Sequence, residues 1–336
     1  MKNTHYIASW FYRESADEAS YYPQMGRKGD SVLAQSVYMQ IQVPFFVTFK
    51  HYNPYCHFLF FTNMRQEDLP SFLIDMFDKI GGVEVVTLQY KCAPPKGWYH
   101  SWANQFFLYD ILNYMENRMD DYDTFTVIDA DCICQRSLTP FLTQVQQQGT
   151  GLYVVADEDG WSSSDLTQSE MEDIYETFYG RKPSTPLFYY GGEFISLRGD
   201  KVREVNHAYV PLWEFNLKLF EENKPKLNQE ALLFSVLAEH LQIRNNYGNS
   251  YIKRIWTNPH LNNCKPEDRN LSIWHLPYEK RRGLHYLYNK LSKTNYEIAD
   301  EKKFWEKASL FCGVPEITLW KQLRDLVQKS KDIFIR

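Results

Sequence analysis

The sequence predicts an α/β fold with a mixed, mainly parallel sheet and helices on both faces. Three observations lead to this prediction. Short runs of apolar and β-branched residues recur in the first half of the chain, longer segments with helical spacing separate them, and 336 residues can bury a large core. Ligands of such sheets bind beyond the carboxyl ends of the strands, so a functional site is expected there.

The strand-like runs are short and are bounded by polar residues. They are Tyr6–Tyr12, Pro44–Phe49, His57–Thr62, Val83–Leu88, Phe125–Asp129 and Leu152–Ala156. Between them, helical patterns cover Ser31–Gln40, Gln66–Ile80 and Trp102–Arg118. This alternation is typical of a doubly wound sheet.

The pattern loosens after Asp157, where about residues 157–186 predict an insertion over the site. A strand returns at Leu187–Leu197, and its paired Gly191 and Gly192 indicate a bend or a close approach of the backbone to a ligand. A long helix is predicted at Gln229–Leu241. We expect one domain over residues 1–290 and a helical tail over 291–336.

The segment Asp129-Ala130-Asp131 follows a buried strand and carries the clearest chemical signal. Residues two apart on a strand project to the same side, so both carboxylates can point at one centre. At about 4 Å they repel by roughly 1 kcal/mol in water and about 4 kcal/mol at an effective dielectric near 20. The pair therefore predicts a divalent cation, and oxygen ligands suit Mg, Mn or Ca. A second such pair, Asp121 and Asp123, lies in a polar link and is interpreted as a turn.

Composition excludes some classes of function. A net charge of -5 gives no basic surface for nucleic acid. The high aromatic content, 16%, is consistent with stacking on sugar or base rings and equally with core packing. Neither a phosphate-binding Gly-x-x-x-x-Gly-Lys-Ser/Thr nor a Gly-x-Gly-x-x-Gly is present, which disfavours ATPase and dinucleotide-binding functions.

The cysteines favour a reducing compartment. Structure-like sequence begins directly after Met1–His5, so we expect no signal peptide and a cytoplasmic protein with free thiols. Cys132 and Cys134 lack the spacing and the second ligand pair of a structural zinc site. They are predicted to be small buried residues on a continuation of the strand.

The C-terminal segment from Glu301 to Arg336 alternates apolar residues, from Phe304 to Phe334, with many Lys and Arg. One interpretation is a basic amphipathic helix that makes peripheral contact with the inner face of an anionic membrane. The other, which we favour, is ordinary packing on the main domain with the lysines in water. No run reaches the eighteen or so apolar residues that a membrane span requires.

Four segments stand in a suggestive order along the chain: Asp129-Ala130-Asp131, Tyr190-Gly191-Gly192-Glu193, Asn228-Gln229-Glu230, and His275 followed by Lys280-Arg281. Together they resemble the GT-A glycosyltransferases, and more narrowly the glycogenin-like and bacterial lipooligosaccharide galactosyltransferases of glycosyltransferase family 8. The resemblance covers roughly residues 4–290. It implies a Rossmann-like GT-A domain and a metal-dependent hexosyltransferase.

The resemblance also implies roles for the charged residues. Asp129, Asp131 and His275 would bind Mn²⁺ or Mg²⁺ against the diphosphate of a nucleotide sugar. Lys280 or Arg281 would neutralise the departing nucleoside diphosphate.

The remaining roles concern the sugar and the nucleotide. Gln229 would lie near the anomeric carbon, with Asn228 or Glu230 on sugar hydroxyls, although the family has Asp at both flanking positions. The alternative is a helix that Asn228 caps, with Glu230 in its first turn. Further substrate contacts are predicted from Gly191, Gly192 and Glu193 to the donor sugar, from Asn104 to the nucleotide, and from Ser9 under the base.

The expected reaction is transfer of a hexose, from UDP-galactose or UDP-glucose, to a glycan or a lipid-linked sugar in polysaccharide biosynthesis. Retention at the anomeric carbon is favoured, and Asp157, Glu158 or Asp159 could supply the base that an inverting enzyme needs. One alternative is a haloacid dehalogenase-type phosphatase, although such a motif normally lies near the N-terminus. Another is a domain that binds a sugar nucleotide without turning it over.

Overall fold

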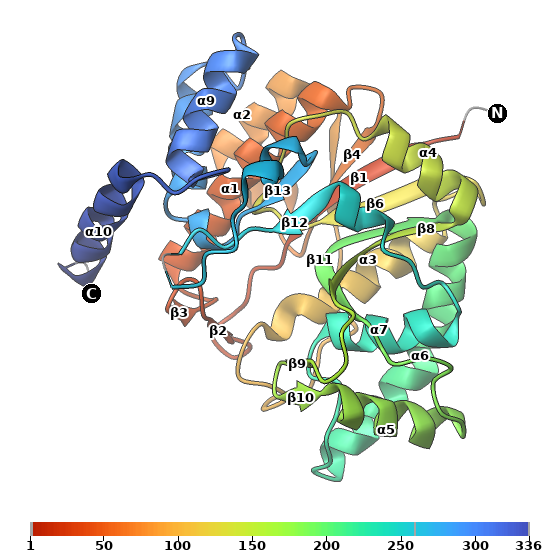
Figure 1. Ribbon diagram of the computed structural model, residues 1–336. Coiled ribbons are helices and arrows are strands. Elements are labelled where there is room, and N and C mark those ends of the chain that lie inside the picture. The colour runs from red at the N-terminus through yellow and green to blue at the C-terminus, as the bar shows by residue number, and fades with distance from the viewer. Residues whose placement is uncertain (1–2, 259, 335–336) are drawn as a thin grey trace.

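The structure, a computed structural model, describes residues 3–258 and 260–334, with side chains as far as Val327 (Figure 1). Its centre is a six-stranded sheet in the order β5-β4-β1-β6-β11-β8. β5, β4, β1 and β6 are parallel neighbours, whereas β11 runs antiparallel to both β6 and β8. The predicted mixed, mainly parallel sheet is confirmed. The strands are β1 His5–Phe11, β4 His57–Thr62, β5 Val83–Thr87, β6 Thr124–Ile128, β8 Thr150–Ala156 and β11 Tyr189–Arg198.

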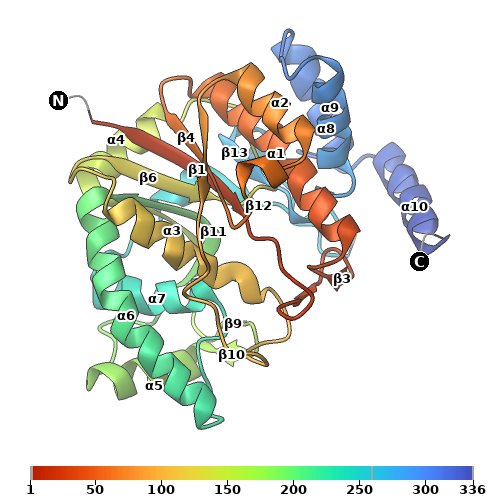
Figure 2. The same cartoon turned by 180° about the vertical axis from the view of Figure 1, so that it is seen from behind.

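Helices cover both faces of this sheet (Figure 1 and Figure 2). One apolar core lies between the sheet and α1 (Val32–Tyr52), α2 (Ser71–Ile80), α4 (Thr139–Gln148) and α8 (Gly283–Lys293). The second core lies between the other face and α3 (Phe107–Glu116), α5 (Gln168–Tyr179), α6 (Gly199–Glu221) and α7 (Glu230–His240). Two helices complete the described chain, α9 (Glu301–Cys312) and α10 (Leu319–Phe334).

A small second sheet positions the site. Its order is β12 (Ile252–Arg254), β13 (Ile273–His275) and β7 (Cys132–Cys134). β13 pairs antiparallel with β7, and this register places His275 opposite Cys132. A late segment of the chain is thereby fixed directly beside the end of β6. The structure also has two short hairpins, β2 (Tyr21–Tyr22) with β3 (Arg27–Lys28) and β9 (Ser162–Ser163) with β10 (Leu166–Thr167).

Most predicted elements are found with ends within two residues, but the predicted strand Pro44–Phe49 is wrong because it belongs to α1. Residues 41–49 of α1 are all buried, so the sequence has no polar face there to reveal a helical period. α1 is also long and apolar enough to cross a membrane, although no uninterrupted apolar run in the sequence predicted a span. Because 67% of its apolar window is buried, it fits the description of a core helix. The helix α6 was not predicted.

α10 departs from the favoured expectation for the tail. Lys321 is fully buried and Asp325 is 7% exposed, whereas Leu319 is 78% exposed and Leu323 65%. Ordinary packing with lysines in water is therefore wrong for the described side chains of α10. The side chains of Ile333 and Phe334 lie outside the described residues. All six cysteines are free thiols, and Cys132 and Cys134 are buried on β7, as predicted.

Candidate active site at the carboxyl end of strand β6

The site begins where β6 ends and the chain turns into β7. The backbone N–H of Cys132 donates to the carbonyl of Asp129 (3.1 Å), and the N–H of Asp129 donates to the carbonyl of Glu193 (3.0 Å). The carbonyl of Asp131 accepts from the N–H of Leu276 (2.9 Å). The turn is thus held by backbone bonds to β11 and to the end of β13, which leaves the carboxylates free to face a cavity.

Asp131 is the centre of a buried charge cluster. The ammonium of Lys280 pairs with its Oδ2, and Nε2 of His275 lies 3.3 Å from its Oδ1. Burial alone would raise the pKa of Asp131, but the positive charges of Lys280 and His275 outweigh burial and hold this pKa well below its usual range. Asp131 is therefore ionised at any physiological pH.

Asp129 has the opposite character although it lies only two residues away. Burial, followed by the negative charge of Asp131, raises the pKa of Asp129 to about 6, and His275 and Lys280 offset this only in part. A buried carboxylate in this state gains from an additional positive charge.

Glu193, on β11, connects His275 to Arg254. The guanidinium of Arg254 donates to both carboxylate oxygens, Nε to Oε1 at 2.7 Å and Nη2 to Oε2 at 2.6 Å. Oε1 also lies 3.2 Å from Nδ1 of His275, at an angle outside that of a good hydrogen bond. Burial would lower the pKa of His275, but Asp131 and Glu193 together raise it to about 9. His275 is thus placed between two carboxylates, one on each ring nitrogen.

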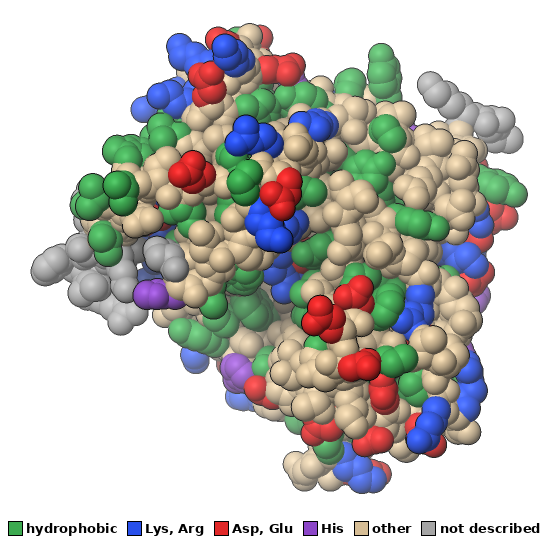
Figure 3. Space-filling view, in the orientation of Figure 1, with side chains coloured by type: hydrophobic (Ala, Val, Ile, Leu, Met, Phe, Trp, Pro, Cys, Tyr) green, Lys and Arg blue, Asp and Glu red, His purple; other side chains and the backbone are tan. Residues whose placement is uncertain are grey.

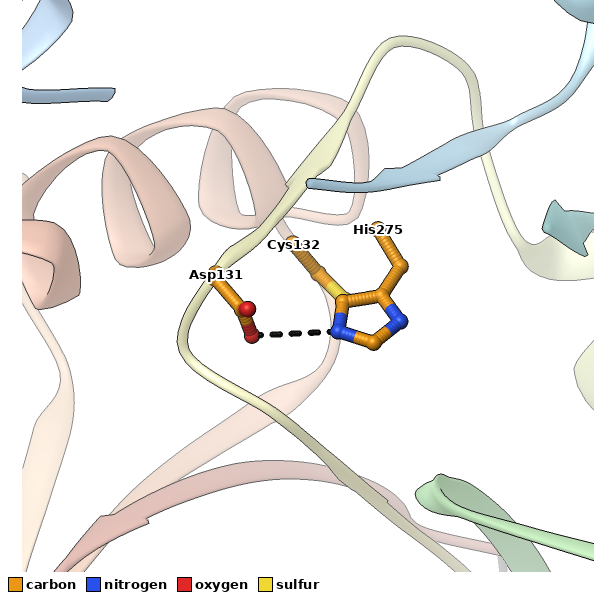
Figure 4. Close-up of side chains that lie close together, drawn as sticks. All are labelled: Asp131, Cys132 and His275. Carbon is orange, nitrogen blue, oxygen red and sulfur yellow. Dashed lines mark ion pairs between the residues drawn. The ribbon is translucent and has the colours of Figure 1, made fainter. Parts of the chain in front are cut away.

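The donor atoms of Asp131, Cys132 and His275 lie within 4.8 Å of one another, and the close-up shows the carboxylate of Asp131 directed at the imidazole (Figure 4). Burial and the neighbouring carboxylates raise the pKa of the Cys132 thiol well above its usual value, so the thiol stays protonated and is a poor metal ligand. Carboxylate oxygens and one imidazole remain, and this imidazole, which its raised pKa keeps protonated at neutral pH, would become a ligand only as a bound ion displaces its proton. That donor set, with the unmet charge of Asp129, fits Mn²⁺ or Mg²⁺.

The cluster forms one wall of a cavity of about 330 Å³. Its other walls are rich in aromatic and amide side chains, which suits rings and hydroxyls. They include Trp10, Tyr12, Tyr22, Tyr38, Trp102, Asn104, Gln105, Ser163, Ser164, Tyr189, Gln229, Glu230 and Trp256. Ser163 and Ser164 belong to the stretch predicted as an insertion over the site.

Gln229 and Glu230 lie at the start of α7 and line the same cavity as the aspartates. Ser164 donates its hydroxyl to Oε1 of Gln229 (2.5 Å). Burial, followed by the charge of Asp129, raises the pKa of Glu230 to about 8. Its Oε2 is buried and has no hydrogen-bond partner among the described residues. Glu230 is therefore protonated at neutral pH and has one carboxyl oxygen available.

The predicted glycine pair serves close packing. A Cβ on Gly192 would collide with the carboxyl group of Glu230, and one on Gly191 would collide with Glu193. Neither glycine has a positive φ. Gly192 lines the cavity.

Four other predicted residues lie in different surroundings. Asn104 lines the cavity, donates to the hydroxyl of Tyr22 (2.9 Å), and leaves its buried Oδ1 without a partner among the described residues. Ser9 is fully buried inside β1 and is not among the residues that line the cavity.

Asn228 binds the carbonyl of Ser164 (2.9 Å) and the ammonium of Lys226 (2.5 Å). The alternative in which Asn228 caps the helix is wrong, because Gln229 occupies the N-cap position. Arg281 lies beside His285, where its charge contributes to lowering the pKa of that imidazole, and outside the set of lining residues.

Sequence reasoning missed Arg254, Tyr38 and Trp102. Arg254 is opposite His275 in the pairing of β12 with β13, a relation that no spacing along the chain reveals. The ring of Tyr38, on α1, lies 5.5 Å from the Lys280 ammonium. Trp102 adopts a positive φ of 47°, which is rare outside glycine and often marks a functional site.

No protein-family model and no curated protein sequence matches the chain. Among solved structures, mouse xyloside xylosyltransferase 1 in its apo form is similar with a TM-score of 0.49 and 9% identity, over 82% of this chain and 97% of that one. The galactosyltransferase LgtC in complex with donor and acceptor sugar analogues is similar with a TM-score of 0.47 and 12% identity, over 90% of this chain and 99% of that one. Both similar structures are glycosyltransferases, the class of enzyme that the sequence motifs resemble.

Proposed function

We propose that this chain is a metal-dependent glycosyltransferase that moves a hexose from a nucleotide sugar to a hydroxyl acceptor. The observation that carries the proposal is that the charged cluster of Asp129, Asp131, His275 and Lys280 lines the same cavity as Gln229 and Glu230. The cavity thus combines carboxylates that gain from a cation with amide and carboxyl groups suited to sugar hydroxyls.

In this proposal Asp129, Asp131 and His275 hold Mn²⁺ or Mg²⁺. When bound, the ion would act as a Lewis acid toward the diphosphate of the donor. Glu193, fixed by the two bonds from Arg254, orients the imidazole of His275, as a carboxylate does for many metal-binding histidines. Lys280 already pairs with Asp131 and lines the cavity, so in this proposal it neutralises charge on the departing phosphate.

Gln229 and Glu230 are the residues proposed to face the sugar. Ser164 holds the Gln229 amide in place, and the free Oε2 of Glu230 can exchange a hydrogen bond with a hydroxyl. Gly192 lets Glu230 approach β11, while Asn104 has an open acceptor for the nucleotide or the sugar. Ser9, Asn228 and Arg281 support the site indirectly in this proposal.

The finer predictions remain part of the proposal: UDP-galactose or UDP-glucose as donor, a glycan or lipid-linked sugar as acceptor, transfer with retention, and a cytoplasmic location. Retention is favoured because Asp157, Glu158 and Asp159, the sequence-based candidates for a general base, are not among the residues that line the cavity. Positioning and charge stabilisation would then carry the reaction.

A panel of UDP-hexoses incubated with the protein, Mn²⁺ and small sugar acceptors tests the proposal. We expect release of UDP that requires the metal and is lost in His275→Ala, with the fold intact by circular dichroism. His207→Ala, which changes an exposed histidine on α6, is the matched control. Release of phosphate from a generic phosphomonoester without sugar transfer would favour the phosphatase alternative. A metal-dependent thermal shift with UDP-sugars and no turnover would favour a binding domain.

A further inference from the structure

The connection from β1 to α1 forms part of the cavity wall. It runs over residues 12–31, several times the roughly 2–6 residues that usually join a strand to the following helix. Long connections of this kind commonly carry function. This one has its own small core, in which Tyr22 and Met25 pack against α1. Tyr22 and Gln24 line the cavity, although none of the four motif segments of the resemblance includes residues 12–31.

A buried carboxylate, that of Glu14, fixes this connection to the segment before α3. Glu14 is 3% exposed. Ser20 donates to it twice, from its N–H (2.9 Å) and from its hydroxyl (2.7 Å), and the same hydroxyl accepts from the N–H of Ala103 (3.0 Å). The N–H of Trp102 also donates to the carbonyl of Tyr21 (3.3 Å). The connection and residues 102–105 are therefore held together as one unit.

The same carboxylate sets the orientation of the Asn104 amide. The hydroxyl of Tyr22 hydrogen-bonds Glu14, and because a carboxylate only accepts, this hydroxyl donates its proton to Glu14. The Tyr22 oxygen is then an acceptor for other groups, and Nδ2 of Asn104 donates to it (2.9 Å). Oδ1 of Asn104 is left buried and without a partner among the described residues.

Two more amide oxygens share this condition. Oε1 of Gln24 and Oε1 of Gln105 are buried and lack a hydrogen-bond partner among the described residues, and both side chains line the cavity. With Oδ1 of Asn104 they make three carbonyl oxygens, which can only accept hydrogen bonds. A buried acceptor without a partner lowers stability unless a ligand supplies a donor. The ligand of these oxygens should therefore offer N–H and O–H groups and no negative charge.

The strand order indicates which part of a nucleotide sugar meets these oxygens. β6, which leads into Asp129 and Asp131, lies between β1 and β11. Gly192, against which Glu230 packs, is on β11, whereas Trp10 is on β1, the strand that the connection follows. A donor whose diphosphate binds at the aspartates and whose sugar lies toward β11 has its nucleoside toward β1.

The lining that β1 and the connection contribute is also aromatic. Trp10, Tyr12, Tyr22 and Trp102 line the cavity, and rings of this kind stack on nucleobases. Figure 3 shows hydrophobic side chains, the class that includes Trp and Tyr, between the β2–β3 and β9–β10 hairpins labelled in Figure 1. A nucleoside matches both features, because it offers a flat base to the rings and ribose hydroxyls and base N–H groups to the oxygens.

We propose that the β1–α1 connection and residues 102–105 form the nucleoside-binding end of the cavity, where Gln24, Asn104 and Gln105 accept hydrogen bonds from the nucleoside. Glu14 and Tyr22 are positioning residues that act through Asn104. The inference rests on the proposed function, because it takes the donor to be a nucleotide sugar.

Titration calorimetry in the presence of Mn²⁺, with UDP and with inorganic pyrophosphate, tests the inference. Both probes carry a diphosphate, but only UDP carries a nucleoside. Loss of one hydrogen bond should weaken UDP binding about threefold to tenfold in Asn104→Ala and in Gln105→Ala, and leave pyrophosphate binding within about twofold of the parent. Tyr22→Phe should give a smaller loss for UDP and should raise KM for the UDP-hexose with little change in kcat.

The matched controls are Gln148→Ala, at an exposed glutamine of α4, and Tyr55→Phe, at a tyrosine that is 92% exposed. Both should bind UDP like the parent. Because Oε1 of Gln105 has no partner among the described residues, Gln105→Ala should keep the thermal midpoint of the parent and remains a test if Asn104→Ala fails to fold.

Two results would overturn this inference alone: a parent that transfers sugar while Asn104→Ala and Gln105→Ala bind UDP normally, or equal losses for UDP and pyrophosphate. Normal UDP binding with a raised KM for the acceptor sugar would assign the three oxygens to the acceptor instead. A parent that binds neither UDP nor another nucleoside diphosphate, and transfers no sugar, would overturn the proposed function as well.

Discussion

Two buried charge clusters lie next to each other in this protein, and they differ in whether their carboxyl oxygens are satisfied. The first surrounds Glu279: its Oε1 accepts from Thr257 and Lys321, its Oε2 accepts from the N–H of Gly283 (2.9 Å), and Lys321 also pairs with Asp325. The second, in the cavity, keeps a buried Oε2 of Glu230 without a partner among the described residues.

This difference distinguishes a network with a structural role from one with a functional role. A satisfied buried network fixes conformation, because every group would lose its partner on movement. A network that contains carboxylates with shifted pKa values and buried atoms without hydrogen-bond partners lowers stability. Such a network is retained where a bound ligand supplies the missing partners. The comparison therefore predicts that changes around Glu279 affect folding, whereas changes around Asp131 affect function.

The largest expected effect is on stability, from Lys321→Met. Loss of this ammonium leaves Glu279 and Asp325 buried with only the guanidinium of Arg324 beside them, 3.9 Å from Glu279 and 2.7 Å from Asp325, which costs about 3–5 kcal/mol of the free energy of unfolding. Urea unfolding measures this loss of stability. The rate of sugar transfer per folded molecule should stay within about twofold of the parent's rate. The double variant Lys321→Met with Glu279→Leu should recover part of the loss, and Lys302→Met on α9 is the surface control. Normal stability of Lys321→Met together with loss of transfer would contradict the distinction between the two clusters.

The next effect is on activity, from Asp131→Asn. The substitution keeps the shape and removes the charge, so we expect kcat/KM for UDP-hexose and Mn²⁺ to fall about a hundredfold to a thousandfold. Asp121→Asn, in the other Asp-x-Asp, is the control: its side chain is 71% exposed and pairs with Arg203 at the surface. An equal loss in both variants would remove the distinction between the two motifs.

Glu230→Gln should make the protein more stable while impairing transfer. The folded-state pKa of Glu230 is raised to about 8, so the native state holds a proton that the unfolded chain loses near pH 4.5. Its burial therefore lowers stability progressively as pH rises from about 4.5 to 8, at roughly 1.4 kcal/mol per pH unit. The variant should gain on the order of a few kcal/mol at pH 8 and almost nothing at pH 4.

The matched control on the same helix is Glu239→Gln. Burial would raise the pKa of Glu239, but bonds from Ser184 and Arg244 lower it, so this variant should be less stable at neutral pH. Thermal melts of both variants across pH show whether each substitution raises or lowers stability. A gain for Glu239→Gln equal to that for Glu230→Gln would contradict the assignment.

The smallest predicted effect is on metal affinity, from Glu193→Gln. Loss of the carboxylate beside Nδ1 should leave His275 less well oriented and weaken Mn²⁺ binding about tenfold to a hundredfold. Titration calorimetry with the metal alone measures the Mn²⁺ affinity without any need for turnover. Arg254→Lys, which keeps the charge and loses the two-pronged contact, should give a smaller loss. Unchanged affinity in Glu193→Gln would mean that Glu193 has only a structural role.

Local sequence was enough to predict the sheet and the position of Asp129 and Asp131, because both depend on strand periodicity. Local sequence did not predict the full extent of α1, because burial on all sides removes the helical periodicity there. Pro44 also suggested a boundary. Glu193 was identified, but its ion pair with Arg254 depends on the pairing of β12 with β13. The inverted face of α10 was hidden for the same reason, since the partner of Lys321 is a distant residue, Glu279.

The contact between Lys321 and Glu279 also bears on how the tail should be studied. A shortened chain that ends before Lys321 would lose the exposed leucines of α10 together with the buried ammonium that contacts Glu279, the residue immediately before Lys280. Deletion would therefore mix the effect of losing the exposed side of α10 with effects on folding and on the neighbouring cavity. Point substitutions on the outward leucines separate them, because those side chains lie on the opposite side of the helix from the anchor.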